Sequence, residues 1–236
     1  MFTPENTVIG FIGTGVMGKS MASHLLSAGF PMIVYNRSKE KAEELLQKGA
    51  IWVSTPMEVA QQANVIFTIV GYPKDVEEVY LGKQGIITNG KSNTYVIDMT
   101  TSTPTLAVKI FEEAKSKGIH AVDAPISGGD IGAREAKLSI MVGGEKEVFL
   151  KLEPLFNILG TNVVYQGAAG AGQHTKMCNQ ITIASNMIGV CEAIIYAENA
   201  GLDPKNVLAS ITSGAAGSWS LSNLAPKMIE GNFEPG

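Results

Sequence analysis

The sequence predicts an α/β fold, a doubly wound and mostly parallel sheet, followed by an all-helical second domain. Short apolar runs alternate with helical patterns through residue 165. A glycine cluster at 167–172 then interrupts the alternation, and residues 173–200 contain no proline and one glycine. Strand–helix alternation is typical of a parallel sheet covered on both faces. We therefore expect one domain over 1–165 and a helical domain over 166–236 that begins with a long interdomain helix.

Eight apolar runs are the expected strands: residues 8–12, 32–36, 51–53, 65–70, 95–99, 121–123, 139–142 and 162–165. Helical patterns follow over 16–28 and 38–48, and each stops at a glycine, which is a common helix end. Prolines at 56, 73 and 104 suit the first turn of three further helices. The 139–142 run follows a glycine-rich loop and is more typical of a hairpin. In the second domain, helices are expected at 173–200, 204–212 and 220–229.

Composition limits the class of protein. The 236 residues are 45% hydrophobic and 17% charged, with a net charge of −4, which indicates a globular chain without nucleic acid as its main partner. Two cysteines exclude a disulfide scaffold, and the three histidines show no metal-ligand spacing. The first seven residues carry no basic residue, and no uninterrupted apolar run reaches about 18 residues. We expect a cytoplasmic protein with no membrane partner and no required metal.

A glycine fingerprint of the form G-x-G-x-x-G follows the first expected strand and opens the first helix. In this context the glycines allow a tight turn, close approach of the backbone to a pyrophosphate, and packing of helix on strand. A Rossmann-like dinucleotide site is therefore predicted, and the alternative is a glycine-rich turn without a ligand. The predicted cofactor-binding residues of this turn are Gly13, Thr14, Gly15, Val16, Met17 and Gly18.

The end of the second expected strand discriminates between two cofactors. NAD sites usually place a carboxylate there for the ribose 2′-hydroxyl, but this chain has Asn36, Arg37 and Ser38. A guanidinium with short hydrogen-bonding side chains suits a 2′-phosphate. We therefore expect NADP. NAD remains the alternative, with Arg37 in solvent and Asn36 on the 2′-hydroxyl.

Two later segments offer groups for a substrate. Ser127, Gly128 and Gly129 follow an expected strand, where consecutive N–H groups can bind an anion, although the segment could equally be an ordinary loop. Lys176 and Asn179 are spaced to share one face near the start of the apolar 173–200 helix. A lysine there either extends its amine to water or acts in catalysis with a pKa lowered by partial burial.

Four ordered motifs together resemble the β-hydroxyacid dehydrogenases, which include 3-hydroxyisobutyrate dehydrogenase and the glyoxylate and succinic semialdehyde reductases. They are the segments 10–18, 98–104, 123–129 and 172–179, and the likeness covers essentially the whole chain. Family members normally continue with further helices, so the resemblance implies that the helical domain is incomplete here.

The resemblance also implies roles for individual residues. It implies that Lys176 is catalytic and that Asn179 contacts the substrate. It places Ser127, Gly128 and Gly129 on the substrate carboxylate, Thr101 near the nicotinamide and substrate, and Val70 and Gly71 in a loop beside the cofactor.

The implied function is an NADP-dependent oxidoreductase of a small β-hydroxy acid or its semialdehyde, such as 3-hydroxyisobutyrate, succinic semialdehyde or glyoxylate. An imine reductase and a non-catalytic NADP-binding module remain alternatives. A 6-phosphogluconate dehydrogenase would need a larger helical domain and a basic phosphate cluster. The apolar 173–200 helix leads us to expect a homodimer or a higher homo-oligomer.

Overall fold

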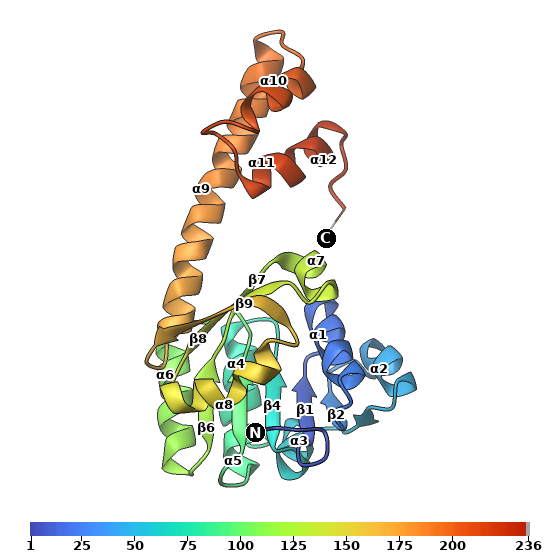
Figure 1. Ribbon diagram of the computed structural model, residues 1–236, viewed down its shortest axis with the longest axis vertical. Helices are drawn as coiled ribbons and strands as arrows, with labels where there is room; N and C mark the ends of the chain where they lie inside the picture. Colours follow the sequence, from blue (N-terminus) through green and yellow to red (C-terminus); the bar gives the residue numbers. More distant parts are fainter. Residues whose placement is uncertain (235–236) are drawn as a thin grey trace. The chain divides into compact units, whose positions relative to one another are not determined.

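The computed structural model describes residues 1–234 (Figure 1). Contacts between Cα atoms divide the chain into a first unit, Met1–Lys176, and a second unit that begins at Met177. The domain boundary expected between residues 165 and 166 remains a prediction. The first unit contains the sheet, and the second contains only helices among its described residues.

The described strands are β1 Ile9–Ile12, β2 Met32–Tyr35, β3 Ile51–Trp52, β4 Val65–Thr68, β5 Tyr95–Asp98, β6 His120–Asp123, β7 Ile126–Ser127, β8 Leu138–Gly143 and β9 Gly160–Gly167. They form one sheet in the order β3-β2-β1-β4-β5-β6-β8-β7, with β9 paired to β8. The strands β1 to β6 pair in parallel, and β8 runs antiparallel to β6 and β7. The predicted doubly wound, mostly parallel sheet is confirmed. The strand at 139–142 pairs antiparallel with the strand before it, as a hairpin would, but a short helix over Gly129–Arg134 connects the two instead of the expected glycine-rich loop.

The parallel strands end at one level. In the register, Ile12 lies opposite Tyr35 and Thr68, Thr68 lies opposite Asp98, and Asp98 lies opposite Asp123. The residues that follow these strands are therefore delivered to a single edge of the sheet. In open α/β sheets, ligands bind at this carboxyl edge.

The helices of the first unit are α1 Val16–Ser27, the 3₁₀ helix η1 Lys39–Ala42, α2 Glu43–Gln47, α3 Pro56–Gln62, α4 Pro73–Leu81, α5 Ile86–Asn89, α6 Pro104–Ser116, α7 Gly129–Arg134 and α8 Lys146–Phe156. The single helix expected over 38–48 is thus a 3₁₀ turn followed by a short α-helix. The loop expected after Gly128 contains α7. The prolines at 56, 73 and 104 each occupy the first turn of a helix, as predicted.

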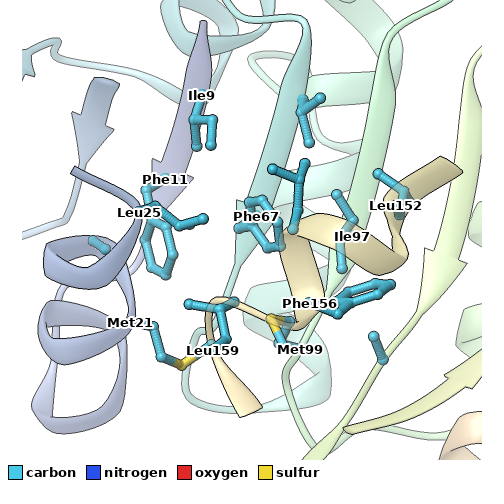
Figure 2. Packing of buried hydrophobic residues seen from close by; sticks show 14 of the residues in the cluster. Ile9, Phe11, Met21, Leu25, Phe67, Ile97, Met99, Leu152, Phe156 and Leu159 are labelled. Atoms are coloured by element: carbon cyan, nitrogen blue, oxygen red, sulfur yellow. The ribbon is translucent and has the colours of Figure 1, made fainter. Parts of the chain in front are cut away.

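Apolar side chains fill both faces of the sheet. Figure 2 shows one face, where α1 and α8 pack on β1, β4 and β5. Phe67 of β4 stacks on Phe11 of β1, with ring centroids 6.1 Å apart, and meets Phe156 of α8 edge-on at 6.4 Å. On the opposite face Gly10 lies against Val59 of α3, where any Cβ would overlap the valine side chain. These contacts fix β1 in the centre of the sheet, so the turn after it has a rigid base.

Helix α9, Ala171–Asn199, begins in the first unit and continues into the second. It begins two positions before the predicted Gln173 start. The second unit adds α10 Pro204–Ile211, α11 Trp219–Asn223 and α12 Ala225–Ile229. The helix expected over 220–229 is therefore two short helices, because Pro226 in the first turn of α12 has no N–H to continue α11. A small core of Val190, Leu221 and Ala225 holds these helices together.

Helix α9 is unusually apolar for an exposed helix. Ile181, Ile188, Ile195 and Tyr196 are all more than half exposed in the single chain. Among the described residues it is the one helix whose length and composition would allow it to cross a membrane. That property is weak evidence for a span, since long apolar helices of soluble proteins share it.

Candidate cofactor and active site

A cavity of about 480 Å³ opens at the carboxyl edge of the sheet, beside β1, β2 and β4. This volume is within the range usual for small-molecule sites. Its lining includes these predicted cofactor residues: Gly13, Gly15, Val16, Met17, Gly18, Asn36, Arg37, Val70 and Gly71. Residues that the sequence reasoning missed also line it, including Tyr35, Lys41, Asp75, Glu78 and Gln84. Thr14, Ser38 and Thr101 are outside this lining.

Each of the three fingerprint glycines is required for a different structural reason. Gly13 has a φ of +95°, and a Cβ there would overlap the carbonyl oxygen of Ile69. A Cβ on Gly18 would overlap the carbonyl oxygen of Gly13. A Cβ on Gly15 would meet nothing within 4 Å among the described residues and would project into open space. Gly13 and Gly18 therefore form the turn, whereas Gly15 leaves room for a ligand.

A hydrogen bond between Thr14 and Asn36 stabilises this turn. The N–H of Thr14 donates to Asn36 Oδ1 at 3.1 Å, and Asn36 Nδ2 donates to the carbonyl oxygen of Ser38 at 2.9 Å. Asn36 thus ties the glycine turn to the end of β2. Thr14 Oγ1 is buried with no hydrogen-bond partner among residues 1–234. A buried hydroxyl without a partner fits a site that a polar ligand completes.

Two cations, Arg37 and Lys41, line the cavity. Arg37 is 77% exposed, and its Nη1 is 3.2 Å from Asp75 Oδ1. Lys41 and Glu78 line the same cavity. The two positive groups are thus accompanied by two carboxylates, so this part of the site has no net surplus of positive charge before a ligand binds.

The residues of the cavity fit a dinucleotide. Gly15 leaves open space at the start of α1, where helix N–H groups would favour a pyrophosphate. Asn36, Arg37 and Lys41 line the cavity after β2, where a ribose would be expected. Val70 and Gly71, in the loop after β4, line the cavity, and the cofactor contact that the family resemblance implies for them stays a prediction.

Lys176 is buried at 7% exposure, in the second turn of α9. Its Nζ donates to the carbonyl oxygen of Ile126 at 2.7 Å, directly before Ser127. Burial lowers the pKa of this amine below its ordinary value. The lysine therefore does not extend to water, and its amine lies beside the segment predicted to bind the carboxylate.

The predicted carboxylate segment has the backbone geometry of a glycine turn. Gly128 and Gly129 are exposed, with φ of +126° and +64°. Ser127 is half-buried at the end of β7. Thr101 is exposed in the loop after β5. Asn179 belongs to the second unit, where its Nδ2 donates to Gln180 Oε1 at 2.8 Å. The substrate roles of these five residues and of Lys176 stay predictions.

A buried polar cluster was not predicted from the sequence. Asp98 Oδ1 accepts hydrogen bonds from Thr68 Oγ1 at 3.1 Å and from the N–H of Thr100 at 3.0 Å. Thr68 Oγ1 in turn lies 2.9 Å from the hydroxyl of Tyr80. Burial raises the pKa of Asp98 to about 6 and raises the pKa of Tyr80. The cluster fixes the ends of β4 and β5 beneath the site.

Two family models cover nearly the whole chain. The NAD-binding domain of 6-phosphogluconate dehydrogenase matches residues 8–167, and the NAD-binding domain of NADP-dependent 3-hydroxyisobutyrate dehydrogenase matches residues 170–236. The cavity and these matches together define an oxidoreductase that binds NAD(P).

Individual proteins narrow the class to a family. An uncharacterized oxidoreductase of Bacillus subtilis is 65% identical over 97% of this chain and 79% of its own length. The 2-hydroxy-3-oxopropionate reductase of Escherichia coli is 39% identical over 97% of this chain and 78% of its own. The solved 3-hydroxyisobutyrate dehydrogenase of Mycobacterium tuberculosis superposes with a TM-score of 0.88 at 29% identity, over 98% of this chain and 80% of its own. The chain belongs to the β-hydroxyacid dehydrogenase family and is an NAD(P)-dependent enzyme of that family.

Proposed function

We propose that the protein is an NADP-dependent dehydrogenase of a small β-hydroxy acid, or equally a reductase of the corresponding semialdehyde. The observation that carries this proposal is the buried amine of Lys176, held 2.7 Å from the Ile126 carbonyl oxygen beside Ser127. It brings a proton-transfer group to the segment that suits a carboxylate.

Lys176 acts as the general base in oxidation and as the general acid in reduction. In oxidation the neutral amine accepts the proton of the substrate hydroxyl, and in reduction the ammonium returns a proton to the carbonyl oxygen. The lowered pKa of Lys176 increases the neutral fraction near pH 7. The nicotinamide, when bound, supplies or accepts the hydride equivalent.

Substrate orientation comes from the loops. Ser127 and the N–H groups of Gly128 and Gly129 bind the substrate carboxylate, which fixes the distance between the reacting carbon and Lys176. Asn179, three residues along α9, orients the reacting oxygen or the lysine. Thr101 lies beside the nicotinamide and the substrate.

NADP is the preferred cofactor in this proposal. Arg37 and Lys41 are two cations on one cavity, and a guanidinium forms charge-assisted hydrogen bonds to a 2′-phosphate. Asn36 already bonds to Thr14 and Ser38, which supports a structural role for its amide rather than contact with a ribose hydroxyl.

The proposed substrates carry a carboxylate close to the reacting carbon. Relatives are named for 3-hydroxyisobutyrate and for 2-hydroxy-3-oxopropionate, and both compounds have this arrangement. We propose these two first, followed by succinic semialdehyde and glyoxylate.

The test follows NADPH absorbance at 340 nm with each semialdehyde and with glyoxylate, and NADP reduction with 3-hydroxyisobutyrate. NADH and NAD are run in parallel on the same protein. Turnover of one acid with a preference for NADP supports the proposal. NADPH binding without turnover of any of these compounds contradicts it and favours a non-catalytic module, unless a cyclic imine is reduced, which would indicate an imine reductase.

We also propose that the protein is a cytoplasmic homodimer. The exposed isoleucines of α9 support self-association, because large apolar patches on a soluble chain commonly mark interfaces. Light scattering after size-exclusion chromatography would give the mass, and a monomer would contradict the assembly. Fractionation of the source cells tests the location.

A further inference from the structure

Gln173 is buried with no exposed surface, yet it carries a polar amide. Its Oε1 accepts the N–H of Ser102 at 2.9 Å, and its Nε2 donates to the carbonyl oxygen of Thr100 at 2.7 Å. The two bonds hold the backbone on both sides of Thr101. A glutamine amide offers one acceptor and one donor side by side, which matches this pair of backbone groups.

The backbone of Gln173 is fixed as well. Its N–H donates to Asp123 Oδ2 at 2.8 Å, and the N–H of Gly170 donates to Asp123 Oδ1 at 2.7 Å. One carboxylate at the end of β6 therefore holds the start of α9. Lys176 lies three residues after Gln173, on the same side of the helix.

The same connection reaches the cofactor cavity. The hydroxyl of Thr100 accepts the N–H of Val70 at 3.0 Å, and Val70 lines the cavity. Gln173 thus joins three segments: the loop after β4, the loop that carries Thr101, and the helix that carries Lys176.

From this arrangement we propose that Gln173 is a positioning residue, which keeps Thr101 and Lys176 at a fixed separation while it touches neither substrate nor cofactor. The inference rests on the proposed function, because it assigns those two residues to the reaction. Misplacing a reacting group by about 1 Å can lower a rate about 100-fold. The expected signature is a loss in kcat rather than in cofactor affinity.

Two variants of Gln173 test the proposal. Gln173→Met keeps the length of the side chain and removes both amide bonds, so kcat should fall about 10- to 100-fold. NADPH affinity should change less than about twofold. Gln173→Glu keeps the acceptor for Ser102 but presents a carboxylate oxygen to the Thr100 carbonyl. Protonation of the glutamate restores the donor, so its kcat relative to the unchanged protein should rise as the pH falls.

The matched control is Gln62→Met, which alters an exposed glutamine of α3 outside the cavity and should leave kcat unchanged. Unchanged kcat in folded Gln173→Met, or equal losses of kcat and NADPH affinity, would overturn the proposal. If the methionine variant does not fold, Gln173→Glu decides, and a loss of kcat that is independent of pH overturns it.

A measurement without turnover separates this proposal from the proposed function. Modification of the Lys176 amine by trinitrobenzenesulfonate across pH, read by mass spectrometry, reports the environment of the lysine. A changed pH profile in Gln173→Met supports positioning even where no tested acid is a substrate. An identical profile contradicts positioning. Inactivity of the unchanged protein contradicts only the function.

Discussion

Arg37 and Asp75, which both line the cofactor cavity, form an ion pair with Nη1 and Oδ1 3.2 Å apart. They are 38 residues apart in the sequence, at the end of β2 and in the first turn of α4. The other oxygen of Asp75 accepts the N–H of Tyr72 at 2.9 Å. Asp75 therefore caps α4 and also pairs with the guanidinium of Arg37, the group that we propose binds the 2′-phosphate.

Removing the charge of Asp75 should strengthen NADPH binding. Asp75→Asn keeps an oxygen for the Tyr72 N–H but releases Arg37, whose guanidinium is exposed, and an ion pair with such a solvated partner is worth about 0.2–1 kcal/mol. We expect about a two- to fivefold lower Kd for NADPH and little change for NADH, measured by fluorescence titration. Glu77→Gln is the control, because it removes the same charge from an ion pair with Lys109, and neither residue lines the cavity. An equal gain in NADPH affinity in both variants would contradict the prediction, because it would show an effect of net charge rather than of the Arg37–Asp75 pair.

Two alanine substitutions in the fingerprint should have opposite consequences. Gly15→Ala adds a methyl group in open space and should leave the melting temperature unchanged, while NADPH affinity falls about tenfold or more, near 1.4 kcal/mol. Gly18→Ala drives a methyl group into the Gly13 carbonyl oxygen, which should destabilise the fold by about 1–3 kcal/mol. Calorimetry and cofactor titration distinguish the two. Normal cofactor affinity in Gly15→Ala would contradict the placement of the pyrophosphate.

The reaction should depend on the protonation of Lys176. Because burial lowers its pKa, the rate of oxidation should rise with pH and level off below the ordinary lysine value of about 10.4. Lys176→Arg keeps a charge but cannot act as a base, so kcat should fall about 10²- to 10⁴-fold with NADPH affinity retained. Steady-state rates and titrations across pH check both. Substantial oxidation by the arginine variant would exclude the lysine as the base.

Asp98 should make the fold less stable as the pH rises. Its folded pKa of about 6 exceeds its unfolded value, so the folded state binds the proton more tightly between about pH 4 and pH 6. The stabilisation is complete below pH 4 and is lost through pH 6, by about 3 kcal/mol. Asp98→Asn preserves an acceptor for Thr68 and Thr100 and should lack this component. Urea unfolding of both proteins at pH 4 and pH 7 measures the difference, and parallel pH profiles would contradict it.

Local sequence patterns predicted much of the fold and part of the site. The alternation of strands and helices predicted the parallel sheet. The glycine spacing predicted a dinucleotide-binding turn, and Gly13, Gly15 and Gly18 of that turn line the cavity. These features depend on residues close together in the chain, where spacing determines geometry. Pro226 carried a signal for the start of α12 that the prediction of one helix over 220–229 overlooked.

The remaining features depend on contacts between distant residues. Gln173 forms hydrogen bonds to backbone groups 71 and 73 residues away. Every residue type has a backbone carbonyl group, so the sequence does not indicate which backbone groups a side chain will meet. Asp75 lies 38 residues from Arg37 in the sequence, and only the folded chain brings the two side chains together. Asp98 similarly gains its partner Thr68 through strand pairing. Such pairs need the tertiary structure.

The aligned ends of the parallel strands have a consequence for how such an enzyme can change. Ile12, Thr68, Asp98 and Asp123 share one level, so each following loop starts from a point set by the backbone ladder and spaced about 4.8 Å from the next. A loop can therefore be lengthened or replaced without moving the origin of its neighbours. Deleting one residue within β5 would instead retract Asp98 and turn successive side chains to the opposite face. Sequence changes that alter substrate preference should therefore occur in these loops, while the lengths of the strands stay constant.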